Sequence, residues 1–107
     1  MPSDQAFVDY IADQLRGAGK ITTRKMFGEY AVYCDAKVVA LVCDNQLYVK
    51  PTPPGQAFAG GVATGSPYPG AKPHFVVTER IDDREWLVEL IACTAAALAA
   101  PRRPKQR

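Results

Sequence analysis

The stretch that decides the fold is residues 24–51, RKMFGEYAVYCDAKVVALVCDNQLYVKP. Its runs of Val, Tyr, Ala and Leu are interrupted twice, at Asp35-Ala36 and at Asp44-Asn45, by residues typical of two-residue hairpin turns. This pattern predicts three short antiparallel strands that follow one another as a meander. Gly28 lies just before the first of them, where a residue without Cβ indicates a β-bulge or a close backbone approach.

Two-residue turns predict which residues of neighbouring strands are opposite each other. They place Cys34 opposite Lys37, Tyr30 opposite Leu41, and Leu41 opposite Tyr48. One face of the meander would then carry Tyr30, Val32, Cys34, Lys37, Val39, Leu41, Tyr48 and Lys50. The other face would carry Ala31, Tyr33, Val38, Ala40, Val42, Leu47 and Val49. Because the second face is almost wholly apolar, we expect it to form the core beneath the helices, and the first to be partly exposed or to contact a partner.

The segment before the meander predicts a helix followed by a strand. Phe7, Val8, Ile11 and Leu15 recur at helical spacing, Ser3 is placed to cap the helix, and the Gly17–Gly19 segment is expected to end it. Residues 21–27 then predict a strand. Its run of polar residues at 22–25 suits the edge of a sheet.

The segment after the meander begins with a long loop. Residues 52–72 hold most of the glycines and prolines, with a short helix indicated at 56–62. Residues 74–78 predict one further strand. The strongest helix begins at Asp82, with Glu85 in the position of a capping box, and Pro101 is expected to stop it. Its buried stripe is predicted to be Leu87, Leu90, Ile91, Thr94 and Leu98, with Trp86 beside it.

Length and charge divide the chain into a body and a tail. The 107 residues suit one domain, which we place at residues 1–100, with a basic, disordered tail at 101–107. The formal charge of +2 depends on four basic residues in that tail; without them 9 basic residues face 11 acidic ones, a balance of −2. We therefore expect no direct nucleic-acid binding by the body, and at most weak, salt-dependent attraction through the tail. No apolar run approaches the ~20 residues of a membrane span and no export signal is evident, so we expect a cytoplasmic protein.

Residues with chemical potential have structural explanations. Cys34 and Cys43 would lie ~20 Å apart in the predicted meander, too far to form a disulfide, and the three cysteines form no metal motif. His74 is the single histidine and is expected to be a half-exposed strand residue. Asp82 and Asp83 suit the start of a helix. The sequence thus predicts no catalytic residues, no metal site and no cofactor.

The meander resembles the TfoX N-terminal domain family, named for the Sxy/TfoX regulators of bacterial natural competence. The resemblance covers most of the chain and is carried by Met26-Phe27-Gly28-x-Tyr30, by KVVALV at 37–42, by NQLYVK at 45–50 and by Pro67-Tyr68. It implies an α+β fold with helices packed on an antiparallel sheet. In the full-length regulators this module precedes a C-terminal helical domain. Those regulators are similar in role to coactivators that work alongside a cyclic-AMP-dependent activator. This chain ends where that domain would begin, so we expect a standalone module.

These observations predict a non-enzymatic interaction module that binds a protein partner, which the resemblance suggests belongs to the transcription machinery. The candidate binding residues surround the mixed aromatic and basic sheet face: Arg24, Lys25, Met26, Phe27, Gly28, Tyr30, Tyr48 and Lys50. The alternative is a small-molecule-binding protein or an enzyme of unrecognised type that uses the loop 52–72 as a lid over the sheet. We expect a monomer or a weak homodimer, with any dimer built on this face rather than edge to edge.

Overall fold

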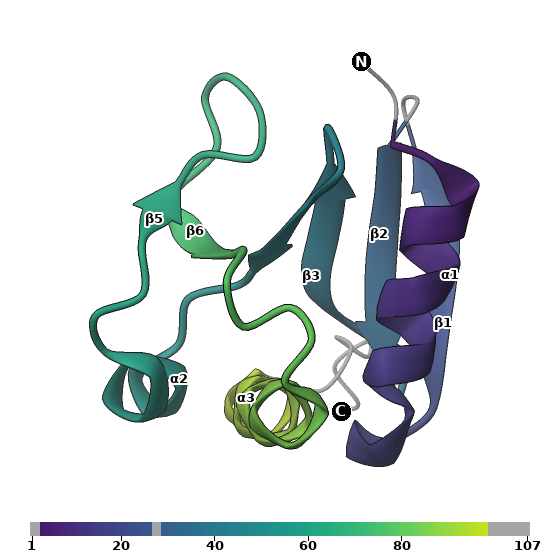
Figure 1. Cartoon of the computed structure of the whole chain (residues 1–107). Helices are drawn as coiled ribbons and strands as arrows, with labels where there is room; N and C mark the ends of the chain where they lie inside the picture. The colour runs from purple at the N-terminus through teal and green to yellow at the C-terminus, as the bar shows by residue number, and fades with distance from the viewer. Residues whose placement is uncertain (1–2, 27–28, 99–107) are drawn as a thin grey trace, which may run out of the picture.

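Three α-helices and a six-stranded antiparallel sheet make up the part of the chain that the computed structural model describes, residues 3–26 and 29–98 (Figure 1). The strands lie in the order β1-β2-β3-β4-β6-β5, which confirms the predicted α+β class and places β1 at an edge of the sheet. In chain order the elements are α1 (Gln5–Gln14), the 3₁₀ turn η1 (Arg16–Ala18), β1 (Ile21–Met26), β2 (Glu29–Cys34), β3 (Lys37–Cys43), β4 (Gln46–Val49), α2 (Pro53–Ala59), β5 (Thr64–Gly65), β6 (His74–Val77) and α3 (Arg84–Ala97). The bulge expected at Gly28, the stop at Pro101 and the basic tail fall outside the described residues.

Both predicted hairpin turns of the meander are confirmed. Asp35 and Ala36 have φ values of 52° and 71°, and Asp44 and Asn45 have φ values of 53° and 58°. Positive φ at both central residues defines a type I′ turn, whose twist matches that of the flanking strands. The turns fix the pairs nearest to them, so that Cys34 lies opposite Lys37 as predicted. On the β3–β4 side the predicted register holds throughout, with Leu41 opposite Tyr48.

The register of β2 against β3 differs from the prediction because β3 contains one extra residue. Val32 lies opposite Ala40, whereas the next residue, Tyr33, lies opposite Val38. Val39 is therefore the extra residue of a β-bulge, and Val39 and Ala40 both belong to the core. Beyond the bulge Tyr30 pairs with Val42, so the predicted pairing of Tyr30 with Leu41 is wrong.

The bulge inverts the predicted faces of β2. Val32 and Cys34 are fully buried in the core cluster, and Tyr30 packs against that cluster, although all three were assigned to the other face. Tyr33, assigned to the core, is only half-buried, as is its partner Val38. The core assignments of β3 and β4 beyond the bulge are confirmed, because Ala40, Val42, Leu47 and Val49 are all fully buried.

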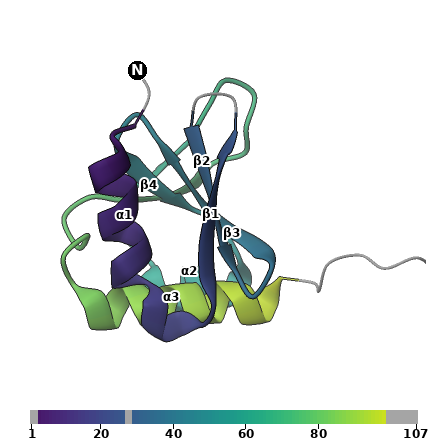
Figure 2. The ribbon, with the colours of Figure 1, turned by 90° about the vertical axis from the view of Figure 1, so that its right-hand side faces the viewer.

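The core lies between the sheet and the helices. It combines α1, the sheet and α3 through Val8, Ile11, Leu15, Val32, Cys34, Val42, Leu47, Val49, Phe75, Val77, Leu87, Leu90 and Ile91. In Figures 1 and 2, α1 lies along the β1–β2 end of the sheet and α3 runs across the lower end of the same side, with α2 beside it. None of the described helices covers the opposite side of the sheet (Figure 2). We call that side the open face.

Ser3 has a different role from the predicted helix cap. The N-cap position of α1 is Asp4, whose side chain forms no capping bond. The Ser3 hydroxyl instead donates to the Glu29 carboxylate over 2.8 Å and accepts from the Asn45 backbone N–H over 2.9 Å. The other Glu29 carboxylate oxygen accepts from the Asp44 backbone N–H over 3.0 Å. Ser3 and Glu29 thus connect the start of the chain to β2 and to the β3–β4 turn.

The C-terminal half matches the prediction in outline. The cap of α3 is Asp83 rather than Asp82, and it accepts from the Trp86 backbone N–H over 3.2 Å. The predicted stripe is buried, with Leu98 half-buried at its end. The loop 52–72 holds more structure than expected. Helix α2 starts earlier, at Pro53, where Thr52 caps it through the Gly55 N–H. The short strand β5, paired with β6, was not predicted.

Lys37 stabilises the end of α3. Its ammonium donates to the backbone oxygens of Ala95 and Leu98 over 2.8 and 3.3 Å. The last carbonyls of a helix lack intrahelical partners and carry its negative dipole, so a cation there is favourable. Lys37→Met should lower the free energy of unfolding by about 1–2 kcal/mol in urea denaturation. Lys25→Met, which removes an exposed lysine of β1, should change it by less than about 0.5 kcal/mol. Equal effects of the two variants would show that the capping bonds are not stabilising.

Candidate functional site

A row of paired residues crosses the open face over five strands. Arg24 pairs with Ala31, Ala31 with Leu41, Leu41 with Tyr48, and Tyr48 with Val76. Residues paired across antiparallel strands point to the same side of a sheet. We call Arg24, Ala31, Leu41, Tyr48 and Val76 the central row.

The central row is apolar in its middle and basic at one end. Ala31 is fully buried by its neighbours, whereas Leu41, Tyr48 and Val76 are half-buried and Arg24 is exposed. Partial burial raises the pKa of the Tyr48 phenol. Like an ordinary tyrosine hydroxyl, it is protonated at neutral pH and can donate a hydrogen bond. The half-buried pair of Tyr33 and Val38 lies on the same face, two residues along β2 and beyond the bulge in β3. The open face thus presents several half-buried apolar side chains, with an exposed arginine at one end of the row.

The structure separates the predicted site residues. Arg24, Met26 and Tyr48 lie on the open face, with Met26 42% exposed. Lys25 pairs with Tyr30 and lies on the helix side of the sheet, so the prediction that these two share the face of Tyr48 is wrong. The reason is the bulge at Val39, which the regular alternation of β2 does not reveal.

The remaining predicted site residues give less information. Phe27 and Gly28 fall outside the described residues. Lys50 follows the end of β4, half-buried, and its backbone N–H donates to the Val39 oxygen over 2.9 Å. The hydroxyl of Tyr30 donates to the Gln5 side chain over 2.9 Å, which joins β2 to α1. Tyr30 and Glu29 therefore have clear structural contacts within the domain.

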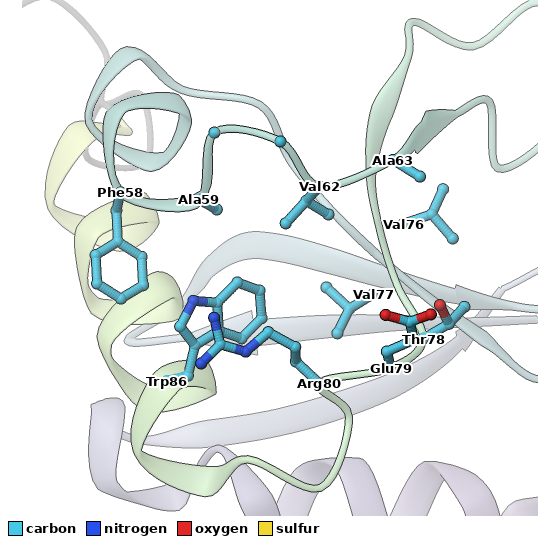
Figure 3. Close-up of a pocket in the computed structure, with 12 residues that line it drawn as sticks. Phe58, Ala59, Val62, Ala63, Val76, Val77, Thr78, Glu79, Arg80 and Trp86 are labelled. Carbon is cyan, nitrogen blue, oxygen red and sulfur yellow. The ribbon is translucent and has the colours of Figure 1, made fainter.

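A second candidate site is a pocket at the β6 end of the sheet, which was not predicted from the sequence. It has a volume of about 480 Å³ and lies between the C-terminal end of α2, the segment 60–63, β6 and the start of α3 (Figure 3). Its principal apolar lining is Phe58, Val62, Val76, Val77 and Trp86. Glu79 and Arg80 contribute charges of opposite sign. The loop 52–72 supplies one wall of this pocket, through Phe58 and the residues that follow it.

Arg80 contacts both Trp86 and Asp83 at this pocket. Its guanidinium carbon lies 4.5 Å from the centre of the Trp86 ring, and one of its nitrogens donates to the Asp83 carboxylate over 2.7 Å. That hydrogen bond lowers the pKa of Asp83, with a further contribution from the Trp86 N–H. The Phe58 ring stacks on Trp86 with the two ring centres 6.0 Å apart. The i, i+3 spacing of Arg80 and Asp83 can be read from the sequence, but the stacking of Arg80 on the single tryptophan cannot.

Other chemically capable groups show structural roles. His74 is buried, not half-exposed as predicted, and its Nδ1 lies 2.8 Å from the Lys72 backbone oxygen. The Tyr10 hydroxyl donates to the Asp82 carboxylate. The cysteines are free, and burial raises the pKa of Cys34 and of Cys43. Over the described ranges no group of His, Cys, Asp and Glu side chains could hold a metal ion, and no helix is long and apolar enough to cross a membrane.

The fold and these two candidate sites define an α+β domain with one open sheet face and a pocket at the β6 end of its sheet. Comparison with known proteins gives the particular family. Residues 13–98 match the TfoX N-terminal domain family, and the chain belongs to that family. It is also 37% identical over 107 residues to a Spirochaeta aurantia protein named "Uncharacterized 12.7 kDa protein in trpE 5'region", with 100% of this chain and 93% of that protein covered.

Proposed function

We propose that this TfoX N-terminal domain is a non-enzymatic interaction module that binds a protein partner through its open face. The observation that supports this most is the central row, where Leu41, Tyr48 and Val76 are only half-buried and no described helix covers them. Apolar surface of this kind is stabilised when a partner removes it from water. This row also contains Arg24 and Tyr48, and arginine and tyrosine are residue types enriched at interface hot spots.

The charge of the open face suggests the chemistry of the partner. Arg24 is exposed at one end of the central row, whereas the nearest acid on β2, Glu29, is bonded to Ser3 and to the Asp44 backbone. A partner with an apolar centre and a carboxylate opposite Arg24 would complement this surface. The family resemblance makes the transcription machinery the proposed source of that partner.

Site-specific photocrosslinking in the native host tests this proposal. A photoreactive phenylalanine analogue at Leu41 should form a discrete adduct with one protein, and the same analogue at Ala92, an exposed position on α3, should not. In the chain that carries the analogue at position 41, Tyr48→Ala and Lys50→Glu should each reduce the yield of the crosslinked adduct. Identical adducts from positions 41 and 92, or none from 41, would refute a partner on this face. An adduct with a second copy of this chain would instead identify a homodimer on the open face.

A further inference from the structure

The pocket at the β6 end of the sheet has a built recognition group that the proposed protein interaction does not use. Its volume of about 480 Å³ falls within the range of ~300–1,000 Å³ typical of small-molecule sites. It opens beside β6, and of the central row it includes only Val76. Such sites combine apolar walls with a few oriented polar groups, and both elements are present here.

The walls of the pocket favour an apolar ligand body. Phe58 is 39% exposed although it stacks on Trp86, so part of its ring is available at the opening. Val62 from the loop and Val77 from β6 lie across from these rings, and Figure 3 shows their side chains pointing into the space between. A phenyl ring or a branched aliphatic group would be in contact with apolar side chains on several sides.

The guanidinium at the pocket favours an acidic ligand. A guanidinium has five N–H donors, and the described contacts of Arg80 place one of its nitrogens on Asp83. Figure 3 shows the guanidinium of Arg80 beside the Trp86 ring, and together with the Asp83 contact this stacking restricts its orientation while its other N–H donors remain available to a ligand. A fixed guanidinium fork matches the two oxygens of a carboxylate.

We propose that this pocket binds a small carboxylate with an apolar body, with Arg80 as the carboxylate-binding residue and Phe58, Val62, Val77 and Trp86 as the apolar walls. Glu79, which also lines the pocket, distinguishes two kinds of ligand. It would repel a simple carboxylate but attract the ammonium group of an α-amino acid. At the ligand efficiency of small molecules, a ligand of about a dozen non-hydrogen atoms should bind with a Kd of about 1 mM.

Trp86 makes the test direct, because it is the single tryptophan of the chain and lines the pocket. Its fluorescence is followed while the full chain is titrated with 3-phenylpropanoate, with phenylalanine, and with 3-phenylpropan-1-ol as a neutral ligand of the same shape. The carboxylates should bind about 10-fold or more tightly than the alcohol, because hydrogen bonds to a charged group are the stronger ones. Calorimetric titration checks that the fluorescence change reports binding.

Four variants locate the site and its charge recognition. Arg80→Met should reduce carboxylate binding to the level of the alcohol and leave alcohol binding unchanged. Glu79→Gln should strengthen 3-phenylpropanoate binding and weaken phenylalanine binding. Val62→Phe should weaken all three ligands by filling the pocket, and it does so without altering Arg80. Arg16→Met, which removes an equal charge from the turn η1, outside the pocket lining, should bind like the unmodified protein.

Three results would overturn the proposal. They are equal binding of 3-phenylpropanoate and the alcohol, undiminished carboxylate binding by Arg80→Met with a native circular dichroism spectrum, and no binding of any probe at about 10 times the expected Kd. If Arg80→Met fails to fold, the Glu79→Gln and Val62→Phe titrations decide the outcome. Binding that is unchanged in both of these variants would likewise refute the site.

Discussion

Deletion of Val39 is expected to abolish stable folding, whereas Val39→Ala is expected to cost about 2 kcal/mol. The deletion removes the extra residue of the β3 bulge, so β2 and β3 can no longer keep their register on both sides of residue 39. Either the Asp35-Ala36 turn must then change its conformation, or β2 must shift by one residue along β3. A shift of one residue moves the side chains of a strand to the opposite face of the sheet. If β2 turns over, Val32, Cys34 and Tyr30 leave the core and Tyr33 enters it.

The size of this loss follows from the burial of those side chains. Each buried side chain of this kind contributes about 1.5–3 kcal/mol, so exposing two or three of them removes ~5 kcal/mol. A domain of this length has a total stability of about 5–15 kcal/mol. Urea denaturation followed by circular dichroism should therefore find the deletion variant largely unfolded even without urea. The Val39→Ala variant should be folded and should unfold in one cooperative transition. A deletion variant as stable as Val39→Ala would show that the bulge does not determine the register.

Phe75→Ala is the second large effect, with an expected loss of about 3–5 kcal/mol in the free energy of unfolding. Phe75 is 2% exposed, lies in β6 opposite Val49 and belongs to the core cluster. Its ring also supports α2, because a Cβ on Gly55 would lie 3.3 Å from a Phe75 ring carbon. Removing the ring leaves a cavity between β6, α2 and α3, which partial relaxation does not fill.

The neighbouring Val76 provides the matched control for Phe75. Val76 is half-buried on the open face, so Val76→Ala should cost about 1 kcal/mol or less. Urea denaturation monitored by Trp86 fluorescence measures both variants. If Val76→Ala were the more destabilising of the two, the assignment of the two faces of β6 would be wrong.

The sequence predicted the elements of this fold because their local signals are strong. The two type I′ turns, the α1 stripe and the α3 stripe each follow from residues close together in the chain. The bulge at Val39 carries no such signal, since five successive apolar residues, 38–42, fit either face. Only the packing of Val39 and Ala40 together against the helices decides between the registers. Ser3 is a similar case, because its partners Glu29 and Asn45 are distant in the chain.

The candidate site was predicted only in part, because local signals fix some of its residues and not others. Leu41 and Tyr48 were placed correctly on the open face because the Asp44-Asn45 turn fixes their register. Tyr30 and Lys25 were misplaced by the bulge, which lies between them and the turn that sets their register. The pocket depends on Arg80 stacking on Trp86 and on the approach of the 58–63 segment, which are tertiary contacts without a periodic pattern.

The measurement that tests the central claim most directly is the affinity of the crosslinked partner for two lysine variants. Leu41→Lys adds a charge at the centre of the open face, and Ala92→Lys adds the same charge to the exposed side of α3. Isothermal titration calorimetry with the purified partner should find Leu41→Lys weakened by about 30-fold or more, the size of a hot-spot loss. Ala92→Lys should bind within about 2-fold of the unmodified chain. Equal affinities of the two variants, with both folded by circular dichroism, would contradict a protein-binding role for the open face.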